Sequence, residues 1–435
     1  MRFKRFVVIF WMIFYGQWAW ASLSIEHWQT ASGARVYFVE NHDLPMLDIS
    51  IEFAAGSGMD TAAQSGLANL VQHLLGMGAG GLSEDQIANA LADVGAQLKN
   101  NFDRDRAGIA LRTLSSERER KQALDVLGRI VQQPEFPQDI VRREKARVTA
   151  SIKESSTKPD YIAEHQLMKM LYGNHSYGLD DMGEADTVDA LQRDDLLKFY
   201  RTHYVAKNAV VAIIGDVTRA EAADIAESLT GKLSLETHNV DLPPVSLPVP
   251  EIKRIVHPAS QSHIQMAYPG LRRDDPDYFP LLVGNHILGG GGFVSRLMEE
   301  VRQKRGLAYS VYSFFAPFKE QGPFQIGLQT KKEQSEEALA LTQKVLQDFV
   351  LNGPTEDELA ASKQNIIGGF PLRIDSNGKI LGFLAVIGFY QLPLTYLSDY
   401  LVAVEAVTAD QIKQAFQRRI KPDGMVVIVV GSKDK

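Results

Sequence analysis

An internal repeat is the feature that most constrains how this chain can fold. Residues 188–217 align without a gap on residues 404–433, at a constant shift of 216. The alignment places Tyr200 on Phe416 and Gly215 on Gly431. A second match lies far away in the chain, where residues 72–76 (QHLLG) align on residues 285–289 (NHILG) at a shift of 213. Two nearly equal shifts so far apart indicate a duplicated domain, against the alternative of chance similarity between helix–strand units.

The repeated segments predict mixed secondary structure in each half. Residues 188–200 and 404–416 have apolar residues at helical spacing, and residues 209–215 and 425–431 read as buried strands. Residues 35–39 and 47–51 alternate apolar and polar residues, as half-buried strands do. The sequence therefore predicts an α+β fold of two homologous domains, each a mostly antiparallel sheet with helices packed on it.

The chain's ends and one proline-rich stretch suggest where the domains begin and end. Residues 1–21 have three cationic residues, an apolar run and Ala19-Trp20-Ala21, which predicts a secretory signal peptide cleaved near Ala21. An uncleaved membrane anchor is the alternative, but the apolar run is short for a span. Residues 237–250 contain four prolines and predict an extended linker. The predicted domains are therefore residues 22–236 and 251–435.

Charge and cysteine content narrow the compartment and the partners. The chain carries a net charge of −7, which becomes −10 once the three cationic residues of the signal peptide are removed. An acidic chain without a basic block argues against a nucleic-acid partner. The chain contains no cysteine, so an exported form gains no disulfides and depends on its core for stability. We expect a periplasmic protein without a membrane span after cleavage.

Residues 66–78 (GLANLVQHLLGMG) predict a helix with side chains in a pattern close to that of a zinc site. Asn69 and His73 are four residues apart and share one helical face, and Gln72 lies beside them. Two histidines at this spacing with an adjacent glutamate would hold zinc and a general base. Of these residues only His73 is a good zinc ligand, and Gln72 cannot take up a proton. By itself, His73 is expected to be a hydrogen-bonded structural histidine.

The chain resembles the pitrilysin/insulinase family of zinc peptidases over essentially its whole mature length. The resemblance rests on GLANLVQHLLGMG, on residues 174–178 (NHSYG), on residues 214–216 (IGD) and above all on residues 287–313 (ILGGGGFVSRLMEEVRQKRGLAYSVYS). The family signature is H-x-x-E-H. Two-domain bacterial members and mitochondrial processing peptidase are similar in size, so the resemblance implies a chain that forms half of a clamshell.

The resemblance implies that the zinc site of this chain has been lost. The first zinc histidine of the family falls on Asn69, the catalytic glutamate on Gln72, and the second zinc histidine on His73. The third ligand follows another acidic residue by seven positions, and because Glu144 matches that residue, the third ligand falls on Ser151. Two of three ligands and the base are therefore replaced, and we expect no zinc in this chain.

The resemblance also implies a second set of residues, and this set is intact. Arg302 and Tyr309 in VRQKRGLAY have the spacing of the family's arginine–tyrosine pair, which holds the substrate and stabilises charge on the scissile carbonyl. Guanidinium and phenol are strong hydrogen-bond donors, and in a closed chamber they act strongly on a forming oxyanion. The alternative is a solvated arginine and an ordinary strand tyrosine.

These observations predict a periplasmic subunit that is inactive alone and assists a homologous, zinc-bearing peptidase subunit in cleaving a peptide. The zinc is expected in the partner, and Arg302 and Tyr309 are expected to be supplied by this chain. One rival hypothesis is a peptidase-like scaffold or peptide-binding protein without a catalytic role. A second rival is a zinc peptidase with an altered site.

Overall fold

The computed structural model describes residues 24–236 and 241–432, and the predicted signal peptide lies outside these residues. The first domain contains a six-stranded sheet in the order β1-β2-β6-β3-β5-β4. Only the β2–β6 pair in this sheet is parallel, and the other neighbours are antiparallel. The strands are β1 (Glu26–Gln29), β2 (Arg35–Glu40), β3 (Met46–Phe53), β4 (Gln97–Phe102), β5 (Ala107–Leu114) and β6 (Val210–Gly215).

Helices cover one face of this sheet because the strands alternate. In β3 the apolar residues Leu47, Ile49 and Ile51 point into a core that α1 and other helices complete from the same side. The polar residues between them lie on the opposite face. The helices of this half are α1 (Leu67–Leu74), α2 (Glu84–Ala92), α3 (Glu117–Gln132), α4 (Gln138–Ser155), α5 (Pro159–Tyr172), α6 (Ala185–Ala190), α7 (Arg193–His203) and α8 (Arg219–Thr230).

The second domain repeats this plan with a five-stranded sheet in the order β7-β11-β8-β10-β9. Its β7–β11 pair is parallel and its other neighbours are antiparallel. The strands are β7 (Glu251–Val256), β8 (Gln261–Pro269), β9 (Ser310–Phe315), β10 (Pro323–Lys331) and β11 (Val426–Ser432). The helices are α9 (Tyr278–Asn285), α10 (Ser335–Asn352), α11 (Glu356–Gly369), α12 (Asn377–Tyr390), α13 (Tyr396–Ala406) and α14 (Ala409–Arg419). The α+β prediction is confirmed.

The structure reproduces the repeat with the register read from the sequence. Both ends of α7 and α14 differ by the shift of 216, and β6 is followed at the same shift by β11. The prediction of one continuous helix over residues 188–200, and of one over 404–416, is wrong. Each segment contains two helices, because Gln192 and Thr408 accept backbone hydrogen bonds as N-caps and start a new helix there.

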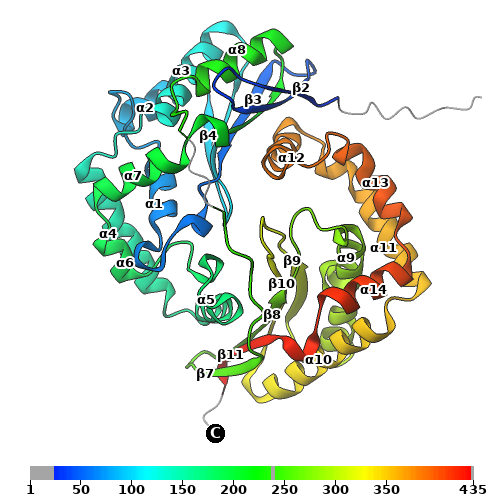
Figure 1. Cartoon of the computed structure of the whole chain (residues 1–435). Coiled ribbons are helices and arrows are strands. Elements are labelled where there is room, and N and C mark those ends of the chain that lie inside the picture. Colours follow the sequence, from blue (N-terminus) through cyan, green and yellow to red (C-terminus); the bar gives the residue numbers. More distant parts are fainter. Residues whose placement is uncertain (1–23, 237–240, 433–435) are drawn as a thin grey trace, which may run out of the picture.

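The two domains exchange a helix. Helix α5 belongs to the first half of the chain but packs on β8 and β11, and α12 belongs to the second half but packs on β2, β3 and β6. Figure 1 shows α12 beside the first sheet and α5 beside the second. Consequently, the apolar face of each sheet away from its own helices is covered by the other half of the chain.

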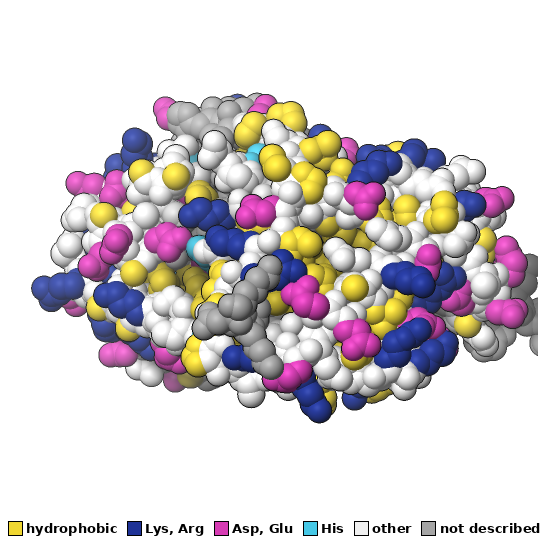
Figure 2. Space-filling model, turned by 90° about the horizontal axis from the view of Figure 1, so that it is seen from below, with side chains coloured by type: hydrophobic (Ala, Val, Ile, Leu, Met, Phe, Trp, Pro, Cys, Tyr) yellow, Lys and Arg dark blue, Asp and Glu magenta, His cyan; other side chains and the backbone are white. Residues whose placement is uncertain are grey.

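Residues 241–250 contain no helix or strand and run between the two halves. Within residues 24–236 and 241–432, no helix is both long enough and apolar enough to cross a bilayer. The face of the molecule seen in Figure 2 carries cationic and acidic side chains interspersed, without a broad patch of one sign.

Candidate functional site

Helix α1 starts at a buried carboxylate. The backbone N–H of Gly66 donates to Asp60 Oδ2 at 2.8 Å, and that of Ala68 donates to Asp60 Oδ1 at 2.9 Å. Gly66 has φ = 90°, a left-handed conformation that glycine adopts without strain. Burial raises the pKa of Asp60 to about 7, although the backbone hydrogen bonds from Ala68 and Gly66 lower it. Asp60 thereby fixes the first turn of the helix that carries Asn69, Gln72 and His73.

Gln72 is committed to structure. Its amide Nε2 donates to the carbonyl of Gly108 on β5 at 2.7 Å, and its Oε1 accepts from the hydroxyl of Tyr204 at 3.0 Å. The side chain is buried. An amide fits this position because it needs both a donor and an acceptor, whereas an ionised carboxylate would face the Gly108 carbonyl oxygen without a proton.

His73 is bonded to Glu144 on α4. Its Nε2 lies 3.0 Å from Glu144 Oε2, and the carboxylate also accepts from Arg143 Nε at 2.6 Å and Arg147 Nη1 at 3.1 Å. Glu144 is 1% exposed. Burial works to raise the pKa of Glu144, but the hydrogen bonds from Arg143, His73 and Arg147 outweigh it and lower that pKa to about 2. His73 is therefore part of a charge network that ties α1 to α4.

The second domain contains the same type of contact at the position equivalent to His73. His286 is the counterpart of His73, and its Nδ1 lies 2.9 Å from Ser362 Oγ, while its Nε2 lies 3.2 Å from Asn365 Oδ1. Ser362 and Asn365 lie on α11, which corresponds to α4. Because α4 and α11 begin 218 residues apart, Ser362 takes the place of Glu144 in the second repeat. In both repeats the histidine therefore ties a short helix to the long helix beside it.

The remaining residues of the zinc motif do not complete a metal site. Asn69 is half-buried on α1, and Ser151 is exposed on α4. In the part of the chain that the structure describes, no group of three or more His, Asp or Glu side chains is placed to hold a metal ion. The donor set does not fit zinc, because His73 is bonded to Glu144 and its neighbours supply an amide and a hydroxyl.

Arg302 and Tyr309 lie together on the second domain. The guanidinium of Arg302 lies 5.0 Å from the ring centre of Phe293 and 5.3 Å from that of Tyr309. Tyr309 is 73% exposed and Phe293 is 64% exposed. Arg302 makes no ion pair with any described residue. The two residues are thus brought together by a cation–π contact, and the N–H edge of the guanidinium remains available.

A groove that the sequence reasoning missed lies between the first sheet and α12; we call it the sheet groove. Its volume is about 800 Å³. Its floor includes Asp48, Ser50 and Glu52, the polar positions of β3, and its rim includes strand β4. The signal was present in the sequence, because the alternation LDISIEF places three polar residues on one face of a buried strand.

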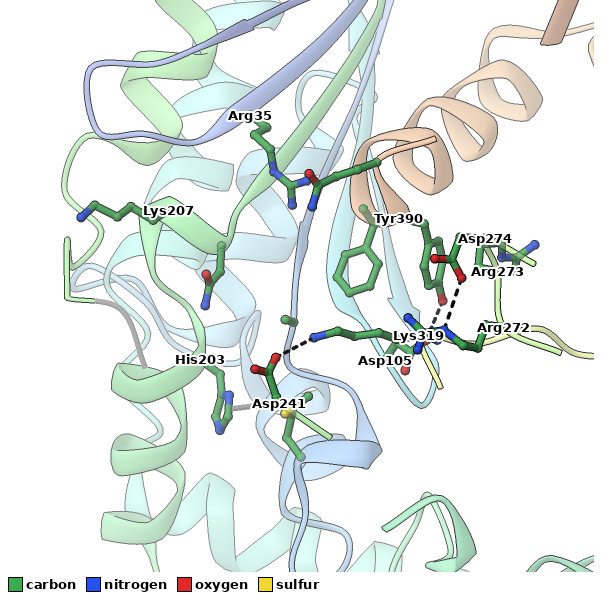
Figure 3. A pocket seen from close by; sticks show the side chains of 15 residues that line it. Arg35, Asp105, His203, Lys207, Asp241, Arg272, Arg273, Asp274, Lys319 and Tyr390 are labelled. Carbon is green, nitrogen blue, oxygen red and sulfur yellow. Dashed lines mark hydrogen bonds and ion pairs between the residues drawn. The ribbon is translucent and has the colours of Figure 1, made fainter. Parts of the chain in front are cut away.

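A smaller hollow of about 430 Å³ lies at the junction of the two domains (Figure 3). Beside it, the buried carboxylate of Asp105 accepts from the hydroxyl of Tyr390 at 2.7 Å and from the backbone N–H of Lys319 at 2.6 Å. Tyr177 donates its hydroxyl to the same carboxylate. Burial raises the pKa of Asp105, against the hydrogen bonds from Tyr177 and Tyr390. These bonds join the first domain to the second.

Comparison with known proteins agrees with this geometry. Residues 35–184 match the family described as "Insulinase (Peptidase family M16)", and residues 190–366 match the "Peptidase M16 inactive domain". A crystal structure of a peptidase M16 inactive domain from Pseudomonas fluorescens is 38% identical, with a TM-score of 0.92, covering 95% of this chain and 98% of that one.

Two curated relatives have different functional descriptions. A "non-peptidase homolog" from Helicobacter pylori is 25% identical over 403 residues, which cover 92% of each chain. The β subunit of a mitochondrial-processing peptidase from Blastocladiella emersonii is 21% identical, covering 92% of this chain and 87% of that one, and its name makes it one part of a larger enzyme. The matches to both halves and the 38% identity across nearly the whole chain establish that this protein belongs to the insulinase family, peptidase family M16.

Proposed function

We propose that this chain is the peptide-holding subunit of a two-chain metallopeptidase, in which a homologous partner carries the zinc and the general base. The observation that carries the proposal is a contrast between two groups of side chains. Gln72 and His73 are engaged in structural hydrogen bonds, whereas Arg302 and Tyr309 are held together at an accessible surface. A chain with a donor pair but no metal ligands can assist hydrolysis but needs zinc from another chain.

An open sheet edge supports a peptide as the bound molecule. Strand β4 is at the end of the first sheet, and within the described residues only β5 pairs with it. An extended peptide can add to such an edge through backbone hydrogen bonds, with alternate side chains entering the sheet groove. This mode reads the backbone first and so accepts many sequences.

Arg302 and Tyr309 would act by donating hydrogen bonds to the peptide being cleaved. The aromatic faces of Phe293 and Tyr309 flank the guanidinium of Arg302, which directs its N–H groups outward. Donors held in advance at the site of a developing oxyanion stabilise the transition state more than the ground state. The partner's zinc would supply Lewis-acid chemistry.

The proposal includes export to the periplasm, with cleavage of the signal peptide near Ala21. The charge, apolar run and small residues of this segment support it. N-terminal sequencing of the protein from a periplasmic fraction tests the location, and an N-terminus at Met1 would contradict it.

Reconstitution tests the assisting role. The chain is co-expressed with an H-x-x-E-H homologue encoded beside it, and peptide cleavage is assayed for each chain alone and for the pair. We expect activity only in the pair, and Arg302→Ala to lower kcat/KM by about 100-fold or more. Arg305→Ala is the matched control, because Arg305 lies on the same segment but is paired with Glu300 at 2.6 Å. Full activity of the homologue alone would contradict the proposal.

The relative described as a non-peptidase homolog favours a second candidate, a scaffold without a catalytic role. A scaffold has no chemical need for Arg302 beside Tyr309. It predicts that Arg302→Ala and Arg305→Ala pairs retain equal turnover, and this result would replace the first proposal with the second.

A further inference from the structure

Glu52 has an unusual environment on the floor of the sheet groove. Its Oε1 accepts from Ser50 Oγ at 2.7 Å and from Asn101 Nδ2 at 2.9 Å. Its Oε2 has no hydrogen-bond partner among the described residues, although Glu52 is only 1% exposed. A buried carboxylate oxygen without a partner is costly, so it calls for a function. Burial raises the pKa of Glu52, against the attraction of Arg106 and the hydrogen bonds from Ser50 and Asn101.

Comparison of the two repeats shows how the space above Glu52 arises. In the second domain Gln325 on β10 pairs with Ala267 on β8, and Gln325 donates to Glu164 of the exchanged helix α5 at 2.7 Å. That bond occupies the space between sheet and helix. Ala267 is the counterpart of Glu52, since Ala267 pairs with Val426 and Glu52 with Val210.

The first domain has glycine at both positions that fill this space in the second. Gly108 pairs with Glu52 and so takes the place of Gln325, and Gly382 of α12 takes the place of Glu164 at the shift of 218 between α5 and α12. A Cβ atom at Gly108 would lie 2.5 Å from Glu52 Oε2, whereas a Cβ atom at Gly382 would have nothing within 4 Å. Two missing side chains therefore leave the unpartnered oxygen facing an open groove.

We propose that Glu52 is a specificity residue that binds a basic side chain, lysine or arginine, of a peptide lying in the sheet groove. This inference rests on the proposed peptide-binding function and names the class of peptide. The carboxylate oxygen needs a hydrogen-bond donor, and it lies at the bottom of the groove, so the donor must be on a long side chain. Lysine and arginine have the length and also supply the charge that a buried carboxylate lacks.

The other charges around the groove are already compensated. Arg112 Nε lies 2.7 Å from Asp48 Oδ1, and Arg106 Nη2 lies 2.9 Å from Asp103 Oδ2. Arg106 attracts Glu52 but is hydrogen bonded to Asp103. Glu52 is consequently the acid in the groove with an oxygen left to bind a ligand cation.

Binding of three labelled peptides tests the inference. Nine-residue acetylated peptides of alternating threonine and valine, with a central lysine, norleucine or glutamine, are titrated with the full mature chain and followed by fluorescence anisotropy. We expect the lysine peptide to bind about ten-fold more tightly than the norleucine peptide, the effect of one charge-assisted hydrogen bond. In Glu52→Gln, which keeps an acceptor for Ser50 and Asn101, the ratio should fall to about one.

A second variant keeps the test independent of any change at Glu52. Gly382→Gln fills the groove from α12 without displacing a neighbour, so it should weaken all three peptides, and Gly369→Gln on α11 is the matched control outside the groove. Equal affinity of the lysine and norleucine peptides for the unmodified chain would overturn the role of Glu52 but leave peptide binding intact. Failure of all three peptides to bind would overturn the proposed function as well.

Discussion

At the scale of single residues, the structure assigns each polar group of α1 a structural partner. Gln72 joins α1 to β5, and His73 joins it to α4. The recurrence of the histidine contact at His286, in a domain whose counterpart segment has Asn285 and His286 in place of Gln72 and His73, indicates that this contact does not depend on zinc. We infer that loss of the metal ligands left a structural role for His73 intact.

This role predicts the effect of removing either histidine. His73→Ala and His286→Ala should each lower the free energy of unfolding by about 1–2 kcal/mol, because each leaves buried hydrogen-bonding groups without a partner. Chemical denaturation measures the change, and zinc analysis of the purified variants provides the control. A His73→Ala protein that loses bound zinc and keeps its stability would contradict the structural role.

Asp60 predicts a pH-dependent stability. Its pKa is about 7 in the folded chain and near 3.8 in the unfolded chain, so the folded state binds more protons between these values. The contribution is fully present below pH 4 and is lost as the pH rises through 7. At about 1.4 kcal/mol for each pKa unit, the whole window is worth on the order of 4 kcal/mol.

Asp60→Asn provides the measurement, because an amide does not titrate in this range. Between pH 5 and pH 8 the free energy of unfolding of the unmodified chain should fall relative to that of Asp60→Asn. Asp181→Asn is a useful companion, since the charge of Asp181 raises the pKa of Asp60 and its removal should move the fall to lower pH. Parallel pH profiles for all three proteins would show that Asp60 has an ordinary pKa.

At the scale of elements, α12 is fitted to a foreign sheet through its glycines. A Cβ atom at Gly388 would lie 2.5 Å from Val210 Cγ1 and 2.7 Å from the ring of Tyr37, whereas Gly382 of the same helix faces open space. Gly388→Ala should therefore destabilise the protein by about 1–3 kcal/mol through overpacking. Gly382→Ala should stabilise it by up to about 1 kcal/mol, because alanine is the better helix former. Thermal unfolding of the pair checks both signs, and equal shifts would contradict the packing.

The elements also show what could be predicted from the sequence. The strands and the register of the repeat follow from local alternation and a constant shift, and these are properties of short segments. The breaks at Gln192 and Thr408 were missed because a helix-like apolar spacing continues across them, while the capping residues decide the boundary.

The candidate site was predictable only in part. The spacing of Arg302 and Tyr309 is local, so the sequence predicts that both belong to one motif. The third aromatic partner, Phe293, and the groove above Glu52 depend on how distant segments pack, which a single sequence does not specify. The meeting of Glu52 with a space left by Gly382 requires the helix exchange, and no local pattern encodes it.

At the scale of the whole molecule, the exchanged helices make the two domains one folding unit. The core of the second half includes Tyr37, Val210 and Ile214 from the first sheet, together with residues of α12. Another core cluster joins residues of α5 to Val426 and Ile428 of the second sheet. Burial of this kind couples the stability of both halves.

This coupling predicts a single cooperative transition. In differential scanning calorimetry the calorimetric and van't Hoff enthalpies of the full chain should agree, because neither sheet keeps its apolar cover when the other half unfolds. Gly388→Ala should move the whole transition to a lower temperature. Two resolved transitions, with only one of them displaced by the substitution, would show that the halves unfold independently.

The helix exchange also sets the order in which this chain can reach its native state. The first sheet is complete once Gly215 has been made, but its cover begins only at Asn377. During synthesis or export, the nascent first half therefore presents Tyr37, Val39 and Ala212 to solvent through the whole intervening stretch. Such a sheet face is prone to aggregate. A holding chaperone that recognises apolar strands would protect it until α12 emerges, so the yield of soluble protein should depend on that chaperone far more than the stability of the finished fold does.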